Sequence, residues 1–228
     1  MHQKTLILLV LMILLLSCNR EQDIDTDAPG AEILGERLAD IIQLIEEYQY
    51  QEAHLLLDKT DSMSRAFGND YAISSVLSNR AWIFQRQSQY DSSIYYYQKS
   101  IEIDEALKDT NVWIKHLKDI GRVLRARGSF SEAARRYEEA MTLARQNKDS
   151  LNIASASNSL GNVLNELKEY SKAFEYFDLA AATWNRLDRK ATYAIALQNK
   201  GSALVNMDSV EAALPFLTNA LSIKESLK

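Results

Sequence analysis

Glycine and proline are scarce in this chain of 228 residues, which contains only seven of the first and two of the second. A β-sandwich or β-barrel needs many tight turns, and glycine and proline supply the backbone geometry of those turns. Their scarcity argues against an all-β fold, and the abundance of alanine, leucine, glutamate and lysine predicts an all-α chain. With 46% hydrophobic and 25% charged residues, the composition is that of a packed domain and not of a disordered one.

Cysteine, histidine and excess positive charge are lacking as well. The single cysteine excludes an internal disulfide, and three histidines do not favour a protein-built zinc site. A formal net charge of -5 and a pI near 5.3 argue against a general nucleic-acid binder. The sequence contains no glycine-rich phosphate loop. No nucleophile is aligned with His54 or His116, so both histidines are expected to be surface or half-buried residues. The sequence thus predicts no catalytic residue, no metal and no cofactor, and an enzyme is the least favoured class.

The first residues have the layout of a secretory signal peptide. Residues 6–16 are uninterruptedly apolar, follow one positive charge and precede Ser17 and Cys18. As a helix they would span about 16 Å, whereas a transmembrane helix must cross a hydrocarbon core of about 30 Å. A signal peptide over residues 1–17 that is removed is therefore favoured over a membrane span.

The run LLSC that ends at Cys18 resembles the lipobox of bacterial lipoproteins. The resemblance implies cleavage before Cys18, lipidation of its thiol and amino group, and stable membrane anchoring in the bacterial cell envelope. Asn19, in place of the aspartate that retains some lipoproteins at the inner membrane, favours the outer membrane. An ordinary signal peptide with an incidental cysteine is the alternative. Residues 18–33 are acidic, are interrupted by Pro29 and Gly30, and are expected to form a flexible tether.

A forty-residue period runs through the rest of the chain. It brings the following residues into register: Tyr50, Tyr90, Phe130, Tyr170 and Val210. On both sides of each aligned residue, apolar side chains recur at three-and-four spacing, which predicts two amphipathic helices per unit. Asp91, Ser131 and Ser171 are expected to be N-caps of the second helices. Five helix pairs at a fixed period predict an α-solenoid over residues 34–228, with these repeat starts: Leu34, Ser74, Ile114, Ala154 and Ala194.

Small and large residues alternate at fixed places in each unit. The small residues of the first helices are Ala81, Gly121, Gly161 and Gly201, and the large residues of the second helices are Leu57, Tyr97, Tyr137, Phe177 and Leu217. This order resembles the tetratricopeptide repeat in its forty-residue subclass, and the resemblance implies a right-handed solenoid of five helix-turn-helix repeats with longer helices and linkers. The family's tryptophan in the first helix and proline at the repeat end are absent. Pro215, inside the last second helix, is expected to kink that helix without breaking it.

In the family that the repeats resemble, the first helices line a concave groove with repeat places 2, 5, 9 and 12. In repeat three these places hold Lys115, Lys118, Arg122 and Arg125, and in repeat four they include Asn158, Asn162 and Asn165. The four basic residues fall within an arc of about 80° and form one stripe. In repeat two, Trp82 is expected to be exposed and to permit a cation–π contact with Arg122. These residues predict a groove that binds an acidic, extended peptide of a partner protein, and a merely solvated charged face is the alternative.

The leading hypothesis is a lipid-anchored interaction scaffold of the cell envelope. A sensor or regulatory input module competes with it, because similar repeats resemble those of membrane histidine kinases and helix-turn-helix regulators. Beyond repeat five no polar capping helix follows, which leaves uncovered the apolar residues Leu214, Phe216, Leu217, Leu221 and Ile223. A partner or self-association at that end is expected, unless the chain continues past Lys228.

Overall fold

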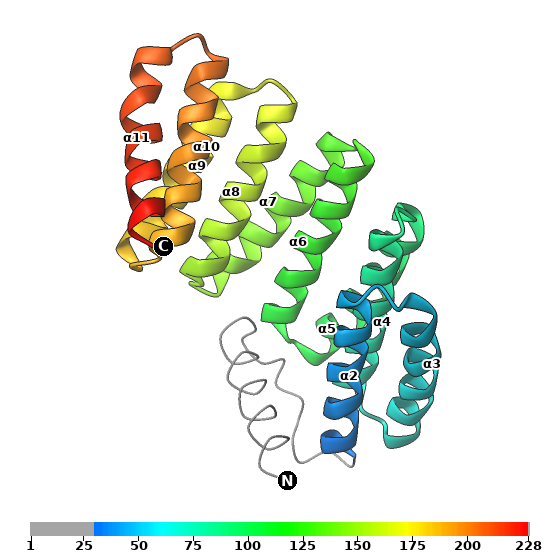
Figure 1. Ribbon diagram of the computed structural model, residues 1–228. Helices are drawn as coiled ribbons and strands as arrows, with labels where there is room; N and C mark the ends of the chain where they lie inside the picture. Colours follow the sequence, from blue (N-terminus) through cyan, green and yellow to red (C-terminus); the bar gives the residue numbers. More distant parts are fainter. Residues whose placement is uncertain (1–29, 228) are drawn as a thin grey trace. The chain divides into compact units, whose positions relative to one another are not determined.

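The computed structural model describes residues 30–227, and this part of the chain consists of ten α-helices without a strand (Figure 1). The helices are α2 (Ala31–Glu46), α3 (Tyr50–Phe67), α4 (Asp70–Arg86), α5 (Tyr90–Leu107), α6 (Thr110–Arg127), α7 (Phe130–Gln146), α8 (Ser150–Glu166), α9 (Tyr170–Arg186), α10 (Lys190–Asn206) and α11 (Val210–Ser226). None of the described helices is long and apolar enough to cross a membrane. The predicted signal peptide, Cys18 and most of the predicted tether lie outside the described residues.

The ten helices form five helix-turn-helix repeats, which confirms the all-α class and the forty-residue period. Only two or three residues connect successive helices. The long period therefore lengthens the helices, as expected, but the expected lengthening of the linkers is wrong. The first helices accordingly begin about one turn ahead of the expected repeat starts, for example at Asp70 where Ser74 was expected. In repeat one, α2 begins at Ala31, so the last three residues of the predicted tether are helical.

The described chain divides into two compact units, the first ending at Ile83 and the second beginning at Phe84, so that α4 contributes to both. Unit 1 has a core of buried residues from α2, α3 and α4, among them Leu34, Ile41, Leu57, Val76 and Ile83. In unit 2 each helix from α5 to α11 packs on the next one along the chain. A core built from neighbours alone is the packing of an α-solenoid.

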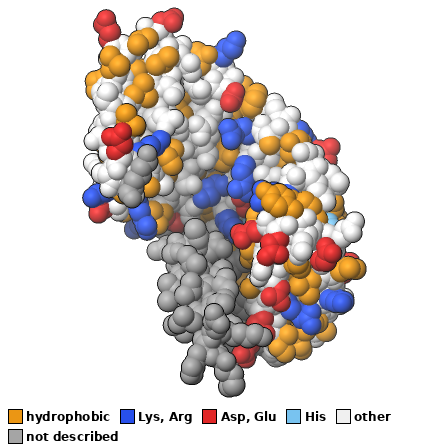
Figure 2. Space-filling view, in the orientation of Figure 1, with side chains coloured by type: hydrophobic (Ala, Val, Ile, Leu, Met, Phe, Trp, Pro, Cys, Tyr) orange, Lys and Arg blue, Asp and Glu red, His pale blue; other side chains and the backbone are white. Residues whose placement is uncertain are grey.

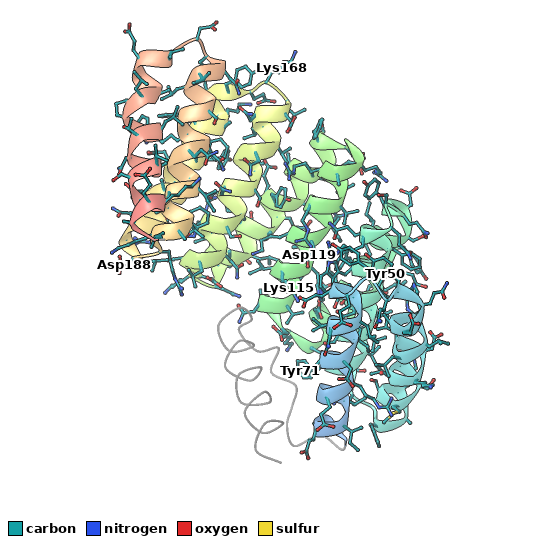
Figure 3. The ribbon with its side chains drawn as sticks, viewed as in Figure 1. Tyr50, Tyr71, Lys115, Asp119, Lys168 and Asp188 are labelled. Carbon is teal, nitrogen blue, oxygen red and sulfur yellow. The ribbon has the colours of Figure 1, made fainter. Side chains whose placement is uncertain are left out.

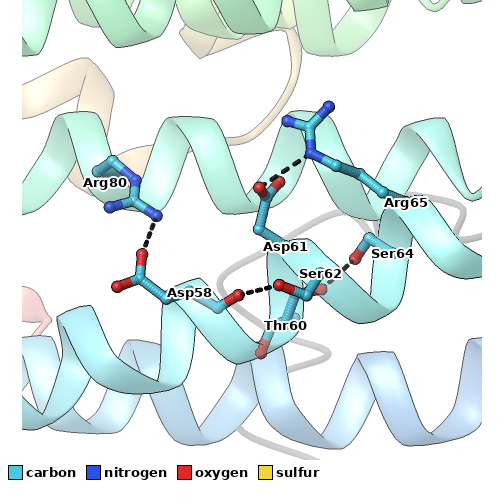
Figure 4. A network of polar contacts seen from close by, with 7 residues as sticks. All are labelled: Asp58, Thr60, Asp61, Ser62, Ser64, Arg65 and Arg80. Atoms are coloured by element: carbon cyan, nitrogen blue, oxygen red, sulfur yellow. Dashed lines mark hydrogen bonds and ion pairs between the residues drawn. The ribbon is translucent and has the colours of Figure 1, made fainter.

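A network of polar contacts lies along α3 of unit 1 and includes one contact with α4 (Figure 4). Arg80 of α4 donates to Asp58 of α3 at 2.8 Å, and Arg65 pairs with Asp61 within α3 at 2.9 Å. The pair of Asp58 with Arg80 recurs three repeats later in unit 2, where Asp178 pairs with Lys200. This recurrence follows the forty-residue register, because each partner is displaced by the same 120 positions.

The predicted pairing of small with large residues is confirmed inside unit 2. A Cβ atom added at Gly161 would lie 2.6 Å from the Phe177 ring, and one added at Gly121 would lie 2.8 Å from the Tyr137 ring. Both distances are shorter than real Cβ contacts. The glycines are therefore needed for the close approach of the two helices in each repeat.

Gly161→Val is expected to lower the free energy of unfolding by about 1–3 kcal/mol, because the added atoms overpack the contact with Phe177. Urea denaturation measures the loss. The control is Ala182→Val at an exposed position of α9, which is expected to cost less than about 1 kcal/mol. Equal stabilities of the two variants would show that the close approach is not required.

The predicted N-caps of the second helices are wrong. Asp91, Ser131 and Ser171 are the second residues of α5, α7 and α9, because each helix already begins at the aligned aromatic residue. Asp91 instead accepts from Arg127 of α6 at 2.6 Å. A residue inside the first turn can no longer cap the helix, and the Asp91 carboxylate instead complements the helix dipole and pairs with Arg127.

Side-chain caps occur on the first helices instead. Asn69, Asp109 and Asp149 stand forty residues apart and precede α4, α6 and α8. In each case the Oδ1 atom accepts from the amide of the third residue of the helix, at 3.0–3.1 Å. In repeat five the equivalent residue is Arg189, which makes no side-chain cap.

The last helix, α11, is continuous through Pro215, as expected for a helix that is not broken. Pro215 lacks the amide that would bond the preceding turn. The hydroxyl of Thr218 donates to the carbonyl of Leu214 at 2.8 Å. The absence of a break is confirmed, and the kink stays a prediction.

Candidate functional site

The four predicted basic residues all lie on α6, where Lys and Arg side chains gather on the face shown in Figure 2. Lys115, Arg122 and Arg125 are exposed, whereas Lys118 is half-buried. Figure 3 labels Lys115 together with Asp119, which lies one turn further along α6. The predicted stripe is thus present with three exposed cations.

Lys118 is engaged within the protein. Its Nζ atom donates to Oδ1 of Asn152 at 2.7 Å and lies 3.3 Å from the hydroxyl of Ser155, both on α8. Burial lowers the pKa of the Lys118 ammonium group, although the carboxylate of Asp119 acts in the opposite direction. Lys118 therefore links the first helices of repeats three and four instead of standing free for a ligand.

Arg122 keeps half of its side chain exposed while one edge is held by its neighbours. Its Nη2 atom donates to Oδ1 of Asp119 at 2.8 Å and, at 3.4 Å, to Oε1 of Gln85. Exposure of the Arg122 side chain is 50%, against 16% for Asp119. The guanidinium is thus oriented by Asp119 and still accessible to a second anion.

The three predicted asparagines are half-buried on α8, and two of them, Asn158 and Asn165, take part in a ladder of amides. Asn199 of α10 donates to Asn158 at 3.0 Å, and Asn206 of α10 donates to Asn165 at 2.9 Å. Contacts of α8 with both α6 and α10 show that the three first helices lie side by side. We call this surface of α6, α8 and α10 the polar face; it combines three exposed cations with a row of carboxamides.

Trp82 does not have the exposed position that the sequence predicted. Its side chain is half-buried and packs against the core of unit 1. Arg122 belongs to unit 2, so the cation–π contact between these residues stays a prediction. The polar face is therefore defined without Trp82.

His116 is a buried residue that the sequence analysis placed wrongly. It is fully buried on α6, and its Nδ1 atom lies 2.6 Å from Oδ2 of Asp104 and 3.1 Å from the hydroxyl of Ser100. Serine, histidine and aspartate are the residue types of a catalytic triad, but here both partners meet the same ring nitrogen and all three residues are buried. The three residues therefore form a buried polar cluster and lack the arrangement of a nucleophile with its base.

A signal for this cluster exists in the forty-residue register. The places of His116 in the later repeats hold Ala156 and Ala196, which are both fully buried. A histidine at a core place needs a polar partner, and Asp104 lies at the core-facing place that Ala144 occupies one repeat later. His54, by contrast, is half-buried as expected, and burial lowers its pKa.

Lys200 is a second buried polar residue that the sequence analysis missed. It is only 9% exposed, pairs with Asp178, and places its ammonium group 4.9 Å and 4.3 Å from the ring centres of Phe174 and Phe216. This arrangement joins α9, α10 and α11 through an ion pair and two cation–π contacts. It therefore stabilises the packing of these three helices.

The chemistry that the polar face can perform is binding. In the described residues, no group of three or more histidine, cysteine, aspartate or glutamate side chains is placed to hold a metal ion. Exposed guanidinium and ammonium groups bind carboxylates, and carboxamides both donate to and accept from a peptide backbone. The arrangement fits an anionic, extended ligand.

Known proteins resemble the chain in sequence and in fold. The tetratricopeptide repeat family matches residues 73–146 and 152–226. Tetratricopeptide repeat protein 29 from Homo sapiens is 27% identical over 192 residues, which are 81% of this chain and 40% of that protein. The protein of the same name from Macaca fascicularis is 26% identical over the same share. The chain thus spans about 40% of the length of these curated relatives.

Solved structures share the fold at low sequence identity. The Signal Transduction ATPase with Numerous Domains (STAND) protein with a tetratricopeptide repeat sensor from Pyrococcus horikoshii has a TM-score of 0.77 at 18% identity, covering 85% of this chain and 30% of that one. BtubC (BKLC) from P. vanneervenii has a TM-score of 0.66 at 16% identity, covering 85% of this chain and 92% of that one. These similarities show the repeat solenoid.

Proposed function

The chain belongs to the tetratricopeptide repeat family, and we propose that it is a lipid-anchored interaction scaffold of the bacterial cell envelope whose polar face holds an acidic, extended peptide of a partner protein. The observation that carries this proposal is the combination of Lys115, Arg122 and Arg125 with the amide ladder on adjacent first helices. The proposal assigns no catalytic step to the protein.

Specificity for an acidic peptide follows from the chemistry of that surface. A peptide carboxylate can approach the exposed part of the Arg122 guanidinium, which Asp119 holds in place. Asn158 and Asn165 are each fixed by an asparagine of α10, so their orientations are set before a ligand binds. Preorganised groups lose less conformational entropy on binding than mobile ones.

Binding to the polar face is tested with a fluorescein-labelled synthetic peptide of alternating glutamate and alanine. The peptide is titrated with the full-length protein while fluorescence anisotropy is recorded. Saturable binding that weakens steeply as salt concentration rises is expected, because screening weakens attraction between exposed charges. A peptide with lysine in place of every glutamate is the control. Equal affinity for the two peptides would contradict the proposal.

Anchoring depends on Cys18, which lies outside the described residues. Cells expressing the full-length chain are expected to incorporate labelled palmitate into it and to retain it in the outer-membrane fraction. Cys18→Ser is expected to abolish the label and to release the protein from that fraction. A labelled Cys18→Ser protein, or an unlabelled parent, would overturn the lipid anchor.

A sensor module is the second candidate, because the STAND protein with a TM-score of 0.77 is described as carrying a tetratricopeptide repeat sensor. Under this alternative, ligand binding to the polar face would regulate an effector domain in the same polypeptide. Reading the coding sequence past Lys228 discriminates between the candidates. A downstream membrane span favours the sensor, and a stop codon favours the scaffold.

A further inference from the structure

A small pocket lies among the helices α5, α6 and α7 of unit 2. Three apolar residues form its floor: Ile94 of α5, and Ile120 and Leu124 of α6. Arg136 of α7 lines it as well. The pocket has a volume of about 150 Å³ and opens to solvent beside the exposed side chain of Gln98. We call it the repeat-three pocket.

The repeat-three pocket and the polar face lie on opposite sides of α6. Successive residues of a helix are separated by about 100° around its axis. This spacing puts Ile120 and Leu124 on the side of α6 that is opposite to Lys115 and Arg122. The two surfaces are therefore separate and can be tested independently.

The forty-residue register shows what the repeat-three pocket lacks. The place of Arg136 holds an aromatic residue in three other repeats, namely Tyr96, Tyr176 and Phe216, and each of these side chains is half-buried. In repeat three, the Nη1 atom of Arg136 instead donates to Oε2 of Glu139 at 3.0 Å. Repeat three therefore lacks the aromatic ring that repeats two, four and five carry at this place.

Ring contacts in repeat two identify the floor of the pocket as the seat of such a ring. Tyr96 stacks on Phe84, with ring centres 5.4 Å apart and ring planes 9° apart. Phe84 stands forty residues before Leu124, so these two residues occupy the same place of the repeat. The floor residue Leu124 thus lies where another repeat seats a tyrosine ring.

The ring of Phe216 in the last repeat indicates the same seat through the two other floor residues. Its centre lies 6.3 Å from that of Phe174, which stands at the place of Ile94. It also lies 4.3 Å from the ammonium group of Lys200, which stands at the place of Ile120. All three floor residues therefore occupy places that contact an aromatic ring elsewhere in the chain.

The size of the pocket limits its occupant to one ring. A cavity of about 150 Å³ with apolar walls is large enough to hold benzene. Sites for cofactors and other small molecules usually enclose about 300–1,000 Å³. The repeat-three pocket, at about 150 Å³, therefore fits a single aromatic side chain and not a whole cofactor.

The cations that line the pocket already have carboxylate partners. Arg127 pairs with Asp91 at 2.6 Å and with Glu132 at 3.4 Å, and Arg136 pairs with Glu139. An anionic ligand would have to compete with these carboxylates. A guanidinium whose edge is held by a carboxylate can still stack its flat face on a ring. The pairing therefore favours a neutral aromatic group over an anion.

The sequence offers no further ring of its own to this pocket. Residues 1–29 and Lys228, which lie outside the described residues, include no phenylalanine, tyrosine or tryptophan. Tyr95, at the edge of the pocket, lies edge-on to Tyr96 with ring centres 5.2 Å apart. Single aromatic side chains that enter small pockets are typical anchors of protein interfaces. These observations favour an aromatic side chain of a partner protein.

We propose that the repeat-three pocket binds one neutral aromatic side chain, phenylalanine or tyrosine, of a partner protein. The ring lies on Leu124 and Ile94, and the guanidinium of Arg136 stacks on its face. Gln98, at the opening, can donate to and accept from the partner's backbone. The bound ring supplies in repeat three the packing that the chain's own rings provide in other repeats. This binding does not depend on the acidic peptide.

The probe for the pocket is N-acetyl-phenylalaninamide, a neutral analogue of one residue within a peptide. Full-length protein that is isotope-labelled at its isoleucine and leucine methyl groups is titrated with this probe while NMR spectra are recorded. Saturable shifts at Ile94, Ile120 and Leu124 are expected, with a dissociation constant in the millimolar range. The methyl groups of Leu55, which is exposed on α3 of unit 1, are expected not to respond.

The aromatic character of the occupant is tested with N-acetyl-cyclohexylalaninamide, which has a ring of similar size without π electrons. This compound is expected to bind about two- to fivefold more weakly, because it lacks the cation–π contact with Arg136. Arg136→Ala, which leaves the floor of the pocket open, is expected to weaken binding of the phenylalanine probe by a similar factor.

Arg136→Tyr supplies the ring that repeat three lacks. The new ring is expected to cover the floor of the pocket and to weaken binding of the phenylalanine probe by about tenfold or more. The matched control is Arg135→Tyr, which makes the same change at an exposed position of α7 that does not line the pocket. This control is expected to leave binding unchanged. Circular dichroism and thermal melting verify that both variants are folded.

Four results would overturn the proposal. The first is that the floor residues do not respond to the phenylalanine probe, whether or not they respond to free p-cresol. The second is equal affinity for the cyclohexyl compound, and the third is unchanged binding by Arg136→Tyr. The fourth is self-association, seen by analytical ultracentrifugation and abolished by Arg136→Tyr, which would make a second copy the occupant. Binding of the glutamate peptide by Arg136→Tyr is expected to be unchanged, so failure of the pocket does not imply failure of the polar face.

Discussion

Asp104→Ala is expected to destabilise unit 2 by about 3–5 kcal/mol, the usual cost of removing one partner from a buried pair of ionisable groups. Asp104 is 1% exposed and His116 is fully buried, and their side chains meet at 2.6 Å. Without the carboxylate, the imidazole would keep only Ser100, and its Nε2 atom already has no hydrogen-bond partner in the described residues. Urea denaturation of the full-length protein measures the loss.

The control restores an arrangement that the chain itself uses one repeat later. Asp104→Ala combined with His116→Ala reproduces the buried pair of Ala144 and Ala156. This double variant is expected to be less destabilised than the sum of the single variants, because it leaves no polar atom stranded. Strictly additive losses would show that Asp104 and His116 do not act as a pair.

Charge reversal on the polar face is the second large effect. Lys115→Glu combined with Arg125→Glu is expected to weaken binding of the glutamate peptide by about 1.4–2.7 kcal/mol, which is tenfold to a hundredfold in affinity. These two residues are exposed, and their replacement spares the contacts of Lys118 with Asn152 and of Arg122 with Asp119. Fluorescence anisotropy measures the change.

The matched control changes the same net charge on a different surface. Arg135→Glu with Arg145→Glu alters two exposed arginines of α7, a second helix outside the polar face. This variant is expected to lose much less affinity, through long-range repulsion that salt screens. If both double variants weaken binding equally, net charge and not the polar face controls the affinity.

The positions of the three exposed cations, Lys115, Arg122 and Arg125, could be read from the sequence, because a helical period places residues three and four apart on one side. Their bonding could not. Lys118 was expected to face the ligand, but its ammonium group reaches Asn152, which lies 34 residues further along the chain. Trp82 was expected to be exposed for the same reason, and packing against the core of unit 1 covers half of it.

The sequence by itself determined the repeat. The forty-residue register, the ten helices and the pairing of Gly161 with Phe177 all follow from patterns within a single unit, where a glycine must face a large side chain if two helices are to approach closely. Membership of the family rests on the same pattern.

Only the tertiary structure decided which polar groups are occupied and which remain accessible. Asn158 and Asn199 lie 41 residues apart, and they meet because successive first helices pack side by side. A hydrogen bond forms only where the distance and the angle between donor and acceptor are suitable. When each repeat has different residues at the bonded places, such bonds between neighbouring repeats leave no periodic pattern in the sequence. The register therefore predicts the position of a residue on its helix, whereas the packing of the helices determines which partner its side chain contacts.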